Sequence, residues 1–177
     1  TDLAHFWDEG FSKELFPENW IQKFKGITNS INYSHLSAVL KWKIDWDGTP
    51  AMIYGLAPRE VAPPGRKKPI MITPVKQGTV LLGNALAEIK SVARDEKVTV
   101  EGHEFVVNRV LAEKGSSAEV RIYMHLADAQ SVLKREGQIN EIQALDCYCA
   151  DETQDTLELL RTQLAPILPE AKVFRMQ

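Results

Sequence analysis

The chain has 177 residues, 44% of them hydrophobic and 25% charged, so it can bury one ordinary core or two small ones. Acidic and basic residues are interspersed along the chain. The resulting net charge of −3 gives no reason to expect a nucleic-acid partner. No apolar run approaches the roughly 18 residues of a membrane helix, and no signal peptide is visible. The chain begins with Thr1 and not Met, which we interpret as a fragment of a longer protein, with N-terminal processing as the alternative.

The first element with a clear pattern is a helix after Pro17, a residue that suits the first helical position. One apolar face of this helix is formed by Trp20, Ile21 and Phe24, and Gly26 fits its C-terminal cap. No good strand precedes Pro17. A first strand is therefore expected within residues 1–8, or it is missing from the fragment.

A β-hairpin is predicted next. Residues 35–46 predict a strand with one buried and one solvent-exposed face. In this segment apolar residues alternate with charged ones: Leu40, Trp42, Ile44 and Trp46 with Lys41, Lys43 and Asp45. Asp47 and Gly48 are a strong turn signal, and residues 51–56 return as the partner strand. For the tryptophans we favour core packing over a stacking platform for a ligand.

A proline-rich excursion at residues 58–69 is the best candidate for a boundary. Its basic cluster, Arg66 to Lys68, is interpreted as a solvated loop and not as a polyanion site. Beyond it the chain predicts short strands at 70–72, 79–82, 98–100, 105–111 and 119–124, a loop at 115–117, and helices at 83–92 and 126–133. In the first of these helices Leu86 and Ile89 are expected to point inward.

The C-terminal part predicts a strand at 139–149, followed by a long helix. Asp151 and Gln154 resemble a capping box at the start of this helix, and Pro166 ends it. Its apolar stripe consists of Leu157, Leu160 and Leu164. A last strand is expected at 172–176. The fold class is therefore α+β, in which the two chain ends supply half of a split βαβ pattern around a β-rich insert.

The sequence predicts no catalytic residue and no cofactor, since it carries no Walker A, G-x-G-x-x-G, H-E-x-x-H or G-x-S-x-G motif. The four histidines, His5, His35, His103 and His125, are widely separated, which is typical of structural or solvent-facing histidines. His5 lies close to Asp8 and Glu9, but a single local cluster without a further ligand is a weak metal site.

Cys147 and Cys149 are the only sharp chemical feature. On a strand they face the same side with Cα atoms about 6.6 Å apart, near the upper limit for a disulfide. Two thiols on one face could share Cu(I) or Zn(II), although a closed zinc site needs two more ligands. We favour two small buried hydrophobic side chains, and leave open a disulfide and a metal or redox role.

Three segments of the chain form an ordered set of motifs. The first is Gln-Gly-Thr-Val-Leu-Leu-Gly at residues 77–83. The second is the hairpin sequence at 98–111, which follows the pattern v-t-v-x-G-x-x-f-x-V-x-x-v-l. The third is the strand-and-helix segment at 122–133, followed by Gly-Gln-Ile-Asn-Glu-Ile at 137–142. Each motif alone is common, but in this order and spacing they resemble the extracytoplasmic core domain of MacB/FtsX-type ABC transporter permeases.

The resemblance implies a two-part fold. Residues 1–57 and 139–177 would form a discontinuous, porter-like α+β subdomain of the split βαβ kind, and residues 58–138 a small inserted β-rich subdomain. The chain departs from better-known members in its Cys-x-Cys pair and its Trp-rich first hairpin. No substrate can therefore be carried over, and the family has no catalytic residue to transfer.

The implied function is that of a non-catalytic domain on the extracytoplasmic (periplasmic) face of the inner or cell membrane, tethered by helices outside this chain. It would couple cytoplasmic ATP hydrolysis to export, lipoprotein handling or a periplasmic partner. The implied partners are a cytoplasmic ATPase subunit, an extracytoplasmic adaptor or lipoprotein, and a second permease copy. The alternative is a soluble metal- or redox-handling protein that uses Cys147 and Cys149.

Overall fold

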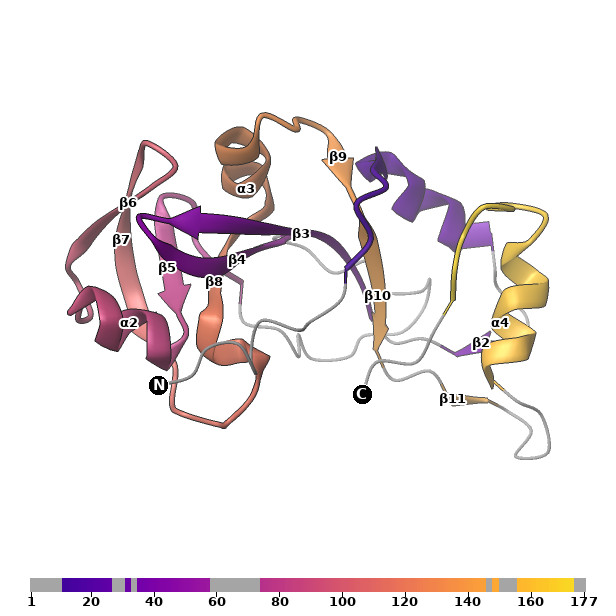
Figure 1. The fold of residues 1–177 in the computed structure, drawn as a ribbon. Helices are drawn as coiled ribbons and strands as arrows, with labels where there is room; N and C mark the ends of the chain where they lie inside the picture. The colour runs from indigo at the N-terminus through magenta and orange to yellow at the C-terminus, as the bar shows by residue number, and fades with distance from the viewer. Residues whose placement is uncertain are drawn as a thin grey trace.

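The computed structural model describes residues 11–26, 31–32, 35–57, 74–145, 148–149 and 156–173 (Figure 1). Its centre is a seven-stranded mixed sheet in the order β10-β3-β4-β8-β5-β7-β6. These strands are β3 (His35–Trp46), β4 (Thr49–Leu56), β5 (Thr79–Leu82), β6 (Lys97–Val100), β7 (His103–Val110), β8 (Arg121–His125) and β10 (Glu141–Leu145). The predicted α+β class is confirmed.

Two short ladders and a few helices complete the described part. β1 (Phe16–Pro17) pairs with β9 (Gln138–Ile139), and β2 (Ile31–Asn32) pairs with β11 (Tyr148–Cys149). The helices are the 3-10 helices η1 (Glu18–Gly26) and η2 (Ser117–Val120) and the α-helices α2 (Asn84–Lys90), α3 (Leu126–Leu133) and α4 (Thr156–Leu164). α4 and η1 lie at the end of the molecule opposite α2 (Figure 1). Within the described ranges, no helix is both long and apolar enough to cross a membrane.

The β3–β4 hairpin is a main structural element of the sheet. Asp47 and Gly48 have φ values of 48° and 79°, which is the turn that a two-residue hairpin loop prefers. β4 then pairs in parallel with β8, and β8 pairs with β5. The sheet thus runs from strands of the predicted porter-like part into strands of the predicted insert. The division into two subdomains stays a prediction.

The main core lies on the face of the sheet that α3 covers (Figure 1). Ile53 of β4 and Ile122 and Met124 of β8 are fully buried there. Gly55 makes room for α3, because a Cβ atom at that position would overlap the Ala129 side chain. Close packing of this kind, and not helix propensity, stabilises a helix of eight residues.

The tip of the β3–β4 hairpin is fastened to the far edge of the sheet. The Trp46 indole Nε1 donates a 2.7 Å hydrogen bond to the Thr99 carbonyl oxygen of edge strand β6. Lys90 Nζ, at the end of α2, donates to the Trp46 carbonyl oxygen at 2.6 Å. Trp46 itself is buried in the core, as the sequence predicts. These contacts cover part of an edge that would otherwise present unpaired backbone groups.

We expect Trp46→Phe to lower the free energy of unfolding by about 1–2 kcal/mol, since the Thr99 carbonyl loses its donor while most of the apolar contact stays. Urea unfolding followed by circular dichroism measures this change. Trp20→Phe is the control, because the Trp20 indole makes no hydrogen bond within the described residues and is only half buried. Equal losses in the two variants would contradict a role for the indole hydrogen bond.

Two predicted side-chain orientations are wrong. Ile89 is 47% exposed, because the buried face of α2 is formed by Ala85, Leu86 and Ala87 instead. Lys41 was expected on a wet strand face and is buried, because both faces of β3 are covered at that point. The alternation identifies the strand correctly but does not show which polar residues stay exposed.

Several element boundaries also differ from the prediction. The helix after Pro17 is a 3-10 helix that begins at Glu18. The strand predicted at 139–149 is divided into β9, β10 and β11, with Asn140 between the first two. The strand predicted from 119 begins at Arg121, after the 3-10 helix η2.

Some predictions fall outside the described residues. These are the first strand and the His5 cluster in residues 1–10, the excursion and short strand in 58–73, Cys147, the cap at Asp151, and most of the last strand. The backbone of Cys149 lies in β11, but its side chain is not described.

Candidate functional site

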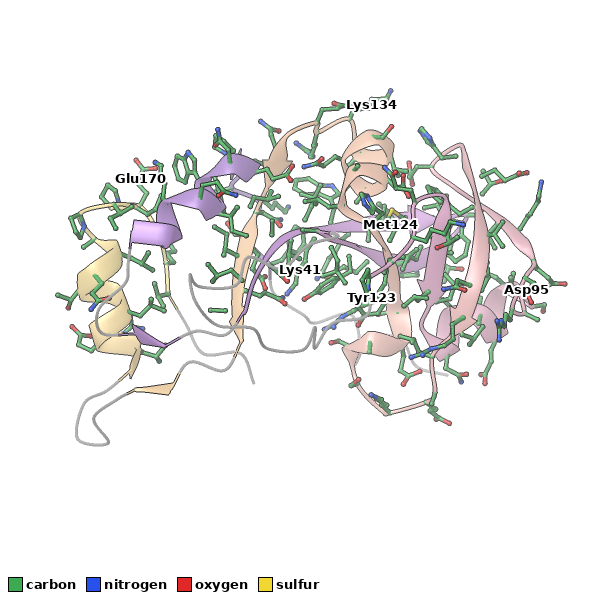
Figure 2. The ribbon with its side chains drawn as sticks, turned by 180° about the vertical axis from the view of Figure 1, so that it is seen from behind. Lys41, Asp95, Tyr123, Met124, Lys134 and Glu170 are labelled. Atoms are coloured by element: carbon green, nitrogen blue, oxygen red, sulfur yellow. The ribbon has the colours of Figure 1, made fainter. Side chains whose placement is uncertain are left out.

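A network of polar and aromatic side chains crosses four neighbouring strands on the face of the sheet opposite α3. We call it the polar ladder, and it consists of Glu141 and Gln143 on β10, Lys41 on β3, Tyr54 on β4, and Arg121 and Tyr123 on β8. The strand register brings them to one face, since Tyr54 lies opposite both Lys41 and Tyr123. Figure 2 shows Met124 on the side of α3 and Tyr123 on the other.

One end of the ladder is a buried ion pair. Lys41 Nζ lies 2.9 Å from Glu141 Oε2, and their side chains are 7% and 16% exposed. The Gln143 amide Nε2 donates to Glu141 Oε1 at 2.6 Å and also to the Tyr54 hydroxyl. Lys41 Nζ lies 4.9 Å from the centre of the Tyr54 ring. A buried charge is costly unless it is paired and hydrogen-bonded, and both conditions are met here.

The other end is built around Arg121. Its guanidinium donates to the Tyr123 hydroxyl at 3.0 Å and to the Ser117 hydroxyl of η2 at 2.6 Å. Its carbon Cζ lies 5.1 Å from the centre of the Tyr54 ring, within the range of a cation–π contact. The rings of Tyr54 and Tyr123 are 5.1 Å apart and tilted by 42°. Tyr54 therefore connects the two ends of the ladder.

Burial raises the pKa of the Tyr54 phenol, and the charge of Lys41 and the hydrogen bond from Gln143 only partly oppose this effect. The phenol therefore stays protonated at ordinary pH. The ladder's hydrogen-bonding groups are engaged with one another, so the arrangement holds β10, β3, β4 and β8 together. Its described contacts are those of a structural network.

We expect part of the tyrosine absorbance change at 295 nm to appear only above the usual titration range near pH 10. Because the raised pKa favours the protonated phenol in the folded state, the stability that Tyr54 contributes is complete below about pH 10 and falls as the pH rises further. Tyr54→Phe should remove the late component. A titration of the wild type with no late component would contradict this assignment.

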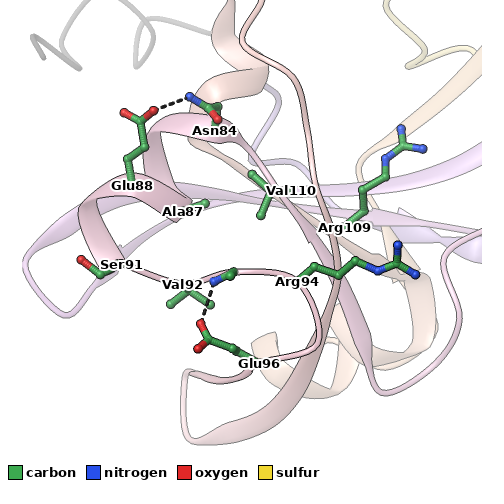
Figure 3. A pocket seen from close by; sticks show the side chains of 10 residues that line it. Asn84, Ala87, Glu88, Ser91, Val92, Arg94, Glu96, Arg109 and Val110 are labelled. Atoms are coloured by element: carbon green, nitrogen blue, oxygen red, sulfur yellow. Dashed lines mark hydrogen bonds between the residues drawn. The ribbon is translucent and has the colours of Figure 1, made fainter.

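Two of the hollows on the described surface lie next to each other. The larger, of about 600 Å³, lies between α2, the turn at 91–96 and β7 (Figure 3). The smaller, of about 180 Å³, lies between β7, the loop at 112–118 and Tyr123. Asn84 and Arg109 line both. The strand and helix that bear these residues were predicted, but no sequence signal indicated that they meet around a hollow.

The side chains of His103 and His125 are described, whereas those of His5 and His35 are not. His103 is exposed beside the β6–β7 turn, and His125 Nδ1 accepts a 3.1 Å hydrogen bond from the Ala127 amide at the start of α3. No group of three His, Cys, Asp or Glu side chains within the described residues is placed to hold a metal ion. Cys147 and the side chain of Cys149 lie outside the described residues, so their suggested roles stay predictions.

Neither a family model nor a curated protein sequence matches the chain. Among solved structures, the chain is similar to the extracellular domain of the noncanonic ABC-type transporter YknZ from Gram-positive bacteria, with a TM-score of 0.52, 13% identity and 85% of both chains covered. It is also similar to the periplasmic region of MacB from Actinobacillus actinomycetemcomitans, with a TM-score of 0.48, 13% identity, and coverage of 80% of this chain and 72% of that chain.

The similarity to the YknZ domain confirms, at the level of the fold, the resemblance that the sequence motifs predict. It extends over most of both chains, so the arrangement of the whole domain is shared and not only one supersecondary unit. At 13% identity the likeness concerns the fold alone.

Proposed function

We propose that the chain is the extracytoplasmic domain of an ABC transporter permease, and that it carries no catalytic activity of its own. In this role it passes the movement driven by cytoplasmic ATP hydrolysis to a substrate or partner outside the membrane. The observation that carries the proposal is the similarity to the YknZ extracellular domain over 85% of both chains.

The three motif segments support the proposal because each occupies a defined place in this fold. The first motif forms β5, between Gly78 with φ of 74° and Gly83 at the start of α2. The second forms the β6–β7 hairpin, and the third forms β8 and α3. Asn140 of the last segment lies at the junction of β9 and β10. The residues that carry the resemblance thus form defined strands, turns and helices of the fold.

The continuous sheet also suits a domain that transmits movement. Seven strands from β10 to β6 are joined in one sheet, and the polar ladder connects four of them by side chains as well as by the backbone. Packed interiors have low compressibility, so a displacement at one end of such a sheet is passed on to the other end. The proposed division into residues 1–57 with 139–177 and residues 58–138 would place the two parts on either side of the β4–β8 ladder.

The proposed setting is the periplasmic or extracellular side of the membrane, with tethering helices supplied by the rest of the protein. The proposed partners are the cytoplasmic ATPase, an extracytoplasmic adaptor or lipoprotein, and a second permease copy. Export and lipoprotein handling are both compatible with this role, and neither is favoured by a particular residue of the chain.

The coding sequence around this segment provides the first test. We expect membrane helices to flank residues 1–177 in the full-length product and an ATPase to be encoded in the same gene or beside it. In the reconstituted transporter, replacing this domain with a Gly/Ser linker should leave basal ATP hydrolysis measurable and abolish substrate movement. A full-length product without membrane helices, made apart from any ATPase, would overturn the proposal.

The soluble metal- or redox-handling alternative gains no specific support, because Cys147 and the side chain of Cys149 lie outside the described residues. It stays a prediction with its own test. The alternative expects the reduced protein to take up stoichiometric Cu(I) or Zn(II) and to lose this uptake in Cys147→Ser.

A further inference from the structure

The smaller hollow is the more enclosed of the two, and it contains a buried carboxylate. It lies between η2, the end of β7 and the loop that joins them, beside Asn84 at the start of α2. Its volume of about 180 Å³ is below the roughly 300–1,000 Å³ of pockets for drug-sized ligands, so a ligand of only several non-hydrogen atoms would fill it. Glu119 of η2 lines this hollow and is only 3% exposed.

The Glu119 carboxylate is only partly satisfied. Its Oε1 accepts a 2.6 Å hydrogen bond from the Lys114 amide, which holds the loop before η2 in place. Within the described residues, Oε2 has no hydrogen-bond donor and the carboxylate makes no ion pair. Oε2 is not fully enclosed either, so it opens into the hollow. Because a buried carboxylate is costly without further partners, this oxygen offers a place to a positively charged donor.

Positive charge surrounds the mouth of the hollow. Arg109 of β7 and Lys114 of the loop line it, and both residues are exposed. The Arg109 guanidinium has no hydrogen bond or ion pair within the described residues. The hollow therefore presents one negative charge inside, from Glu119, and two positive charges at its edge.

We propose that the smaller hollow binds a small zwitterion with the chemistry of a free α-amino acid. The ammonium group would donate to Glu119 Oε2, and the carboxylate would pair with Arg109 and Lys114 through charge-assisted hydrogen bonds. An amine alone would be repelled by the two cations and an acid alone by Glu119, whereas a zwitterion matches both signs. The inference goes beyond the proposed function, because it concerns a ligand of this chain whether or not the chain works in a transporter.

The test is an NMR titration of the ¹⁵N-labelled 177-residue chain with L-alanine. We expect shift changes centred on the amides of Arg109, Lys114 and Glu119. N-acetylalanine lacks the ammonium group and should bind about tenfold more weakly. Alaninamide lacks the carboxylate and should bind severalfold more weakly, since the charges that it no longer meets are exposed. If alaninamide bound as tightly as L-alanine, the hollow would recognise the N-terminus of a peptide, and the proposal of a zwitterion would be wrong.

Two variants separate the two charged ends of the ligand. Glu119→Gln keeps an acceptor for the Lys114 amide and removes the charge, so it should weaken L-alanine about tenfold. Arg109→Gln changes an exposed residue and should weaken L-alanine severalfold. The matched control is Glu113→Gln, which removes a negative charge at an exposed position outside the lining and should leave binding unchanged.

The dispersion of each spectrum shows whether a variant is folded. If Glu119→Gln does not fold, the three ligands on the wild type and the Arg109→Gln variant still decide the question. Absent shifts at high millimolar L-alanine, shifts centred elsewhere, or unchanged binding by a folded Glu119→Gln variant would overturn the proposal. Equal binding of N-acetylalanine would also overturn it, since the hollow would then take an anion without an ammonium group.

Discussion

Replacing Asn140 with alanine is expected to lower the free energy of unfolding by about 2–4 kcal/mol. Asn140 is buried between β9 and β10, and its carboxamide takes the place of a backbone peptide group. Oδ1 accepts from the Lys41 amide at 2.9 Å, and Nδ2 donates to the Lys41 carbonyl at 2.8 Å and to the Ser12 carbonyl at 2.7 Å. Alanine would remove both of these hydrogen bonds from the buried backbone of Lys41, and the bond to the Ser12 carbonyl at the surface as well.

The cost follows from the course of the chain at this point. β10 pairs with β3 from Glu141, which lies opposite Val39. If the ladder continued, Ile139 would lie opposite Lys41, but Ile139 pairs with Phe16 of β1 instead. Asn140 therefore marks the change from one partner strand to another, and its side chain fills the place that the diverging backbone leaves beside Lys41.

Urea unfolding followed by tryptophan fluorescence measures the loss. Asn108→Ala is the matched control, since Asn108 is an exposed asparagine on β7 and its removal should change stability by no more than about 0.5 kcal/mol. Asn140→Asp keeps an acceptor for the Lys41 amide but sets an oxygen against two carbonyl groups, so we expect it to be destabilised as well. If the Asn140→Ala variant were as stable as Asn108→Ala, the Asn140 carboxamide would not take the place of a backbone peptide group beside Lys41.

The elements that could be predicted are those whose signals are local. The Asp47-Gly48 turn and the alternation before it predict the β3–β4 hairpin, and the glycine at 102 similarly fits the tight β6–β7 turn. The short helix at 126–133 is also found where its pattern places it. In each case turn residues and periodicity within one segment are sufficient.

The polar ladder could not be predicted, because its members come from distant parts of the chain. The alternating pattern predicts a solvent-facing Lys41, and only the folded structure places Glu141 beside it. Tyr54 and Arg121 likewise have no local signal for their contact. A buried lysine within an alternating strand becomes recognisable only when the opposite strand offers a carboxylate at the right register.

The larger hollow was missed for a different reason. The pattern at 83–92 predicted a helix that would bury Ile89, whereas α2 ends at Lys90 with Ile89 exposed. Periodicity defines the end of a helix poorly. Here the left-handed position at the end of α2 is occupied by Ser91, and not by the glycine or asparagine that usually indicates such an end. The position of that end decides whether Val92 and Val110 are covered.

Gly83→Ala is expected to destabilise the domain by about 3 kcal/mol or more, through overpacking against backbone. A Cβ atom on Gly83 would overlap the carbonyl oxygens of Ala118 and Glu119 in η2. Gly83 also donates to the Arg121 carbonyl at 2.9 Å, so it cannot move away without breaking this bond. Its own dihedral angles, φ −60° and ψ 149°, are ordinary for any residue.

Gly115→Ala separates steric overlap from backbone strain. Gly115 has φ of 61°, and no atom lies within 4 Å of the place that an added Cβ would take, so alanine there should cost about 1 kcal/mol through strain alone. Gly83→Ala has the reverse combination, with allowed dihedral angles and no space. Thermal unfolding of both variants measures the difference. A cost at Gly83 no larger than that at Gly115 would show that α2 and η2 can separate easily, and the close contact between them would then not be what requires glycine at the end of β5.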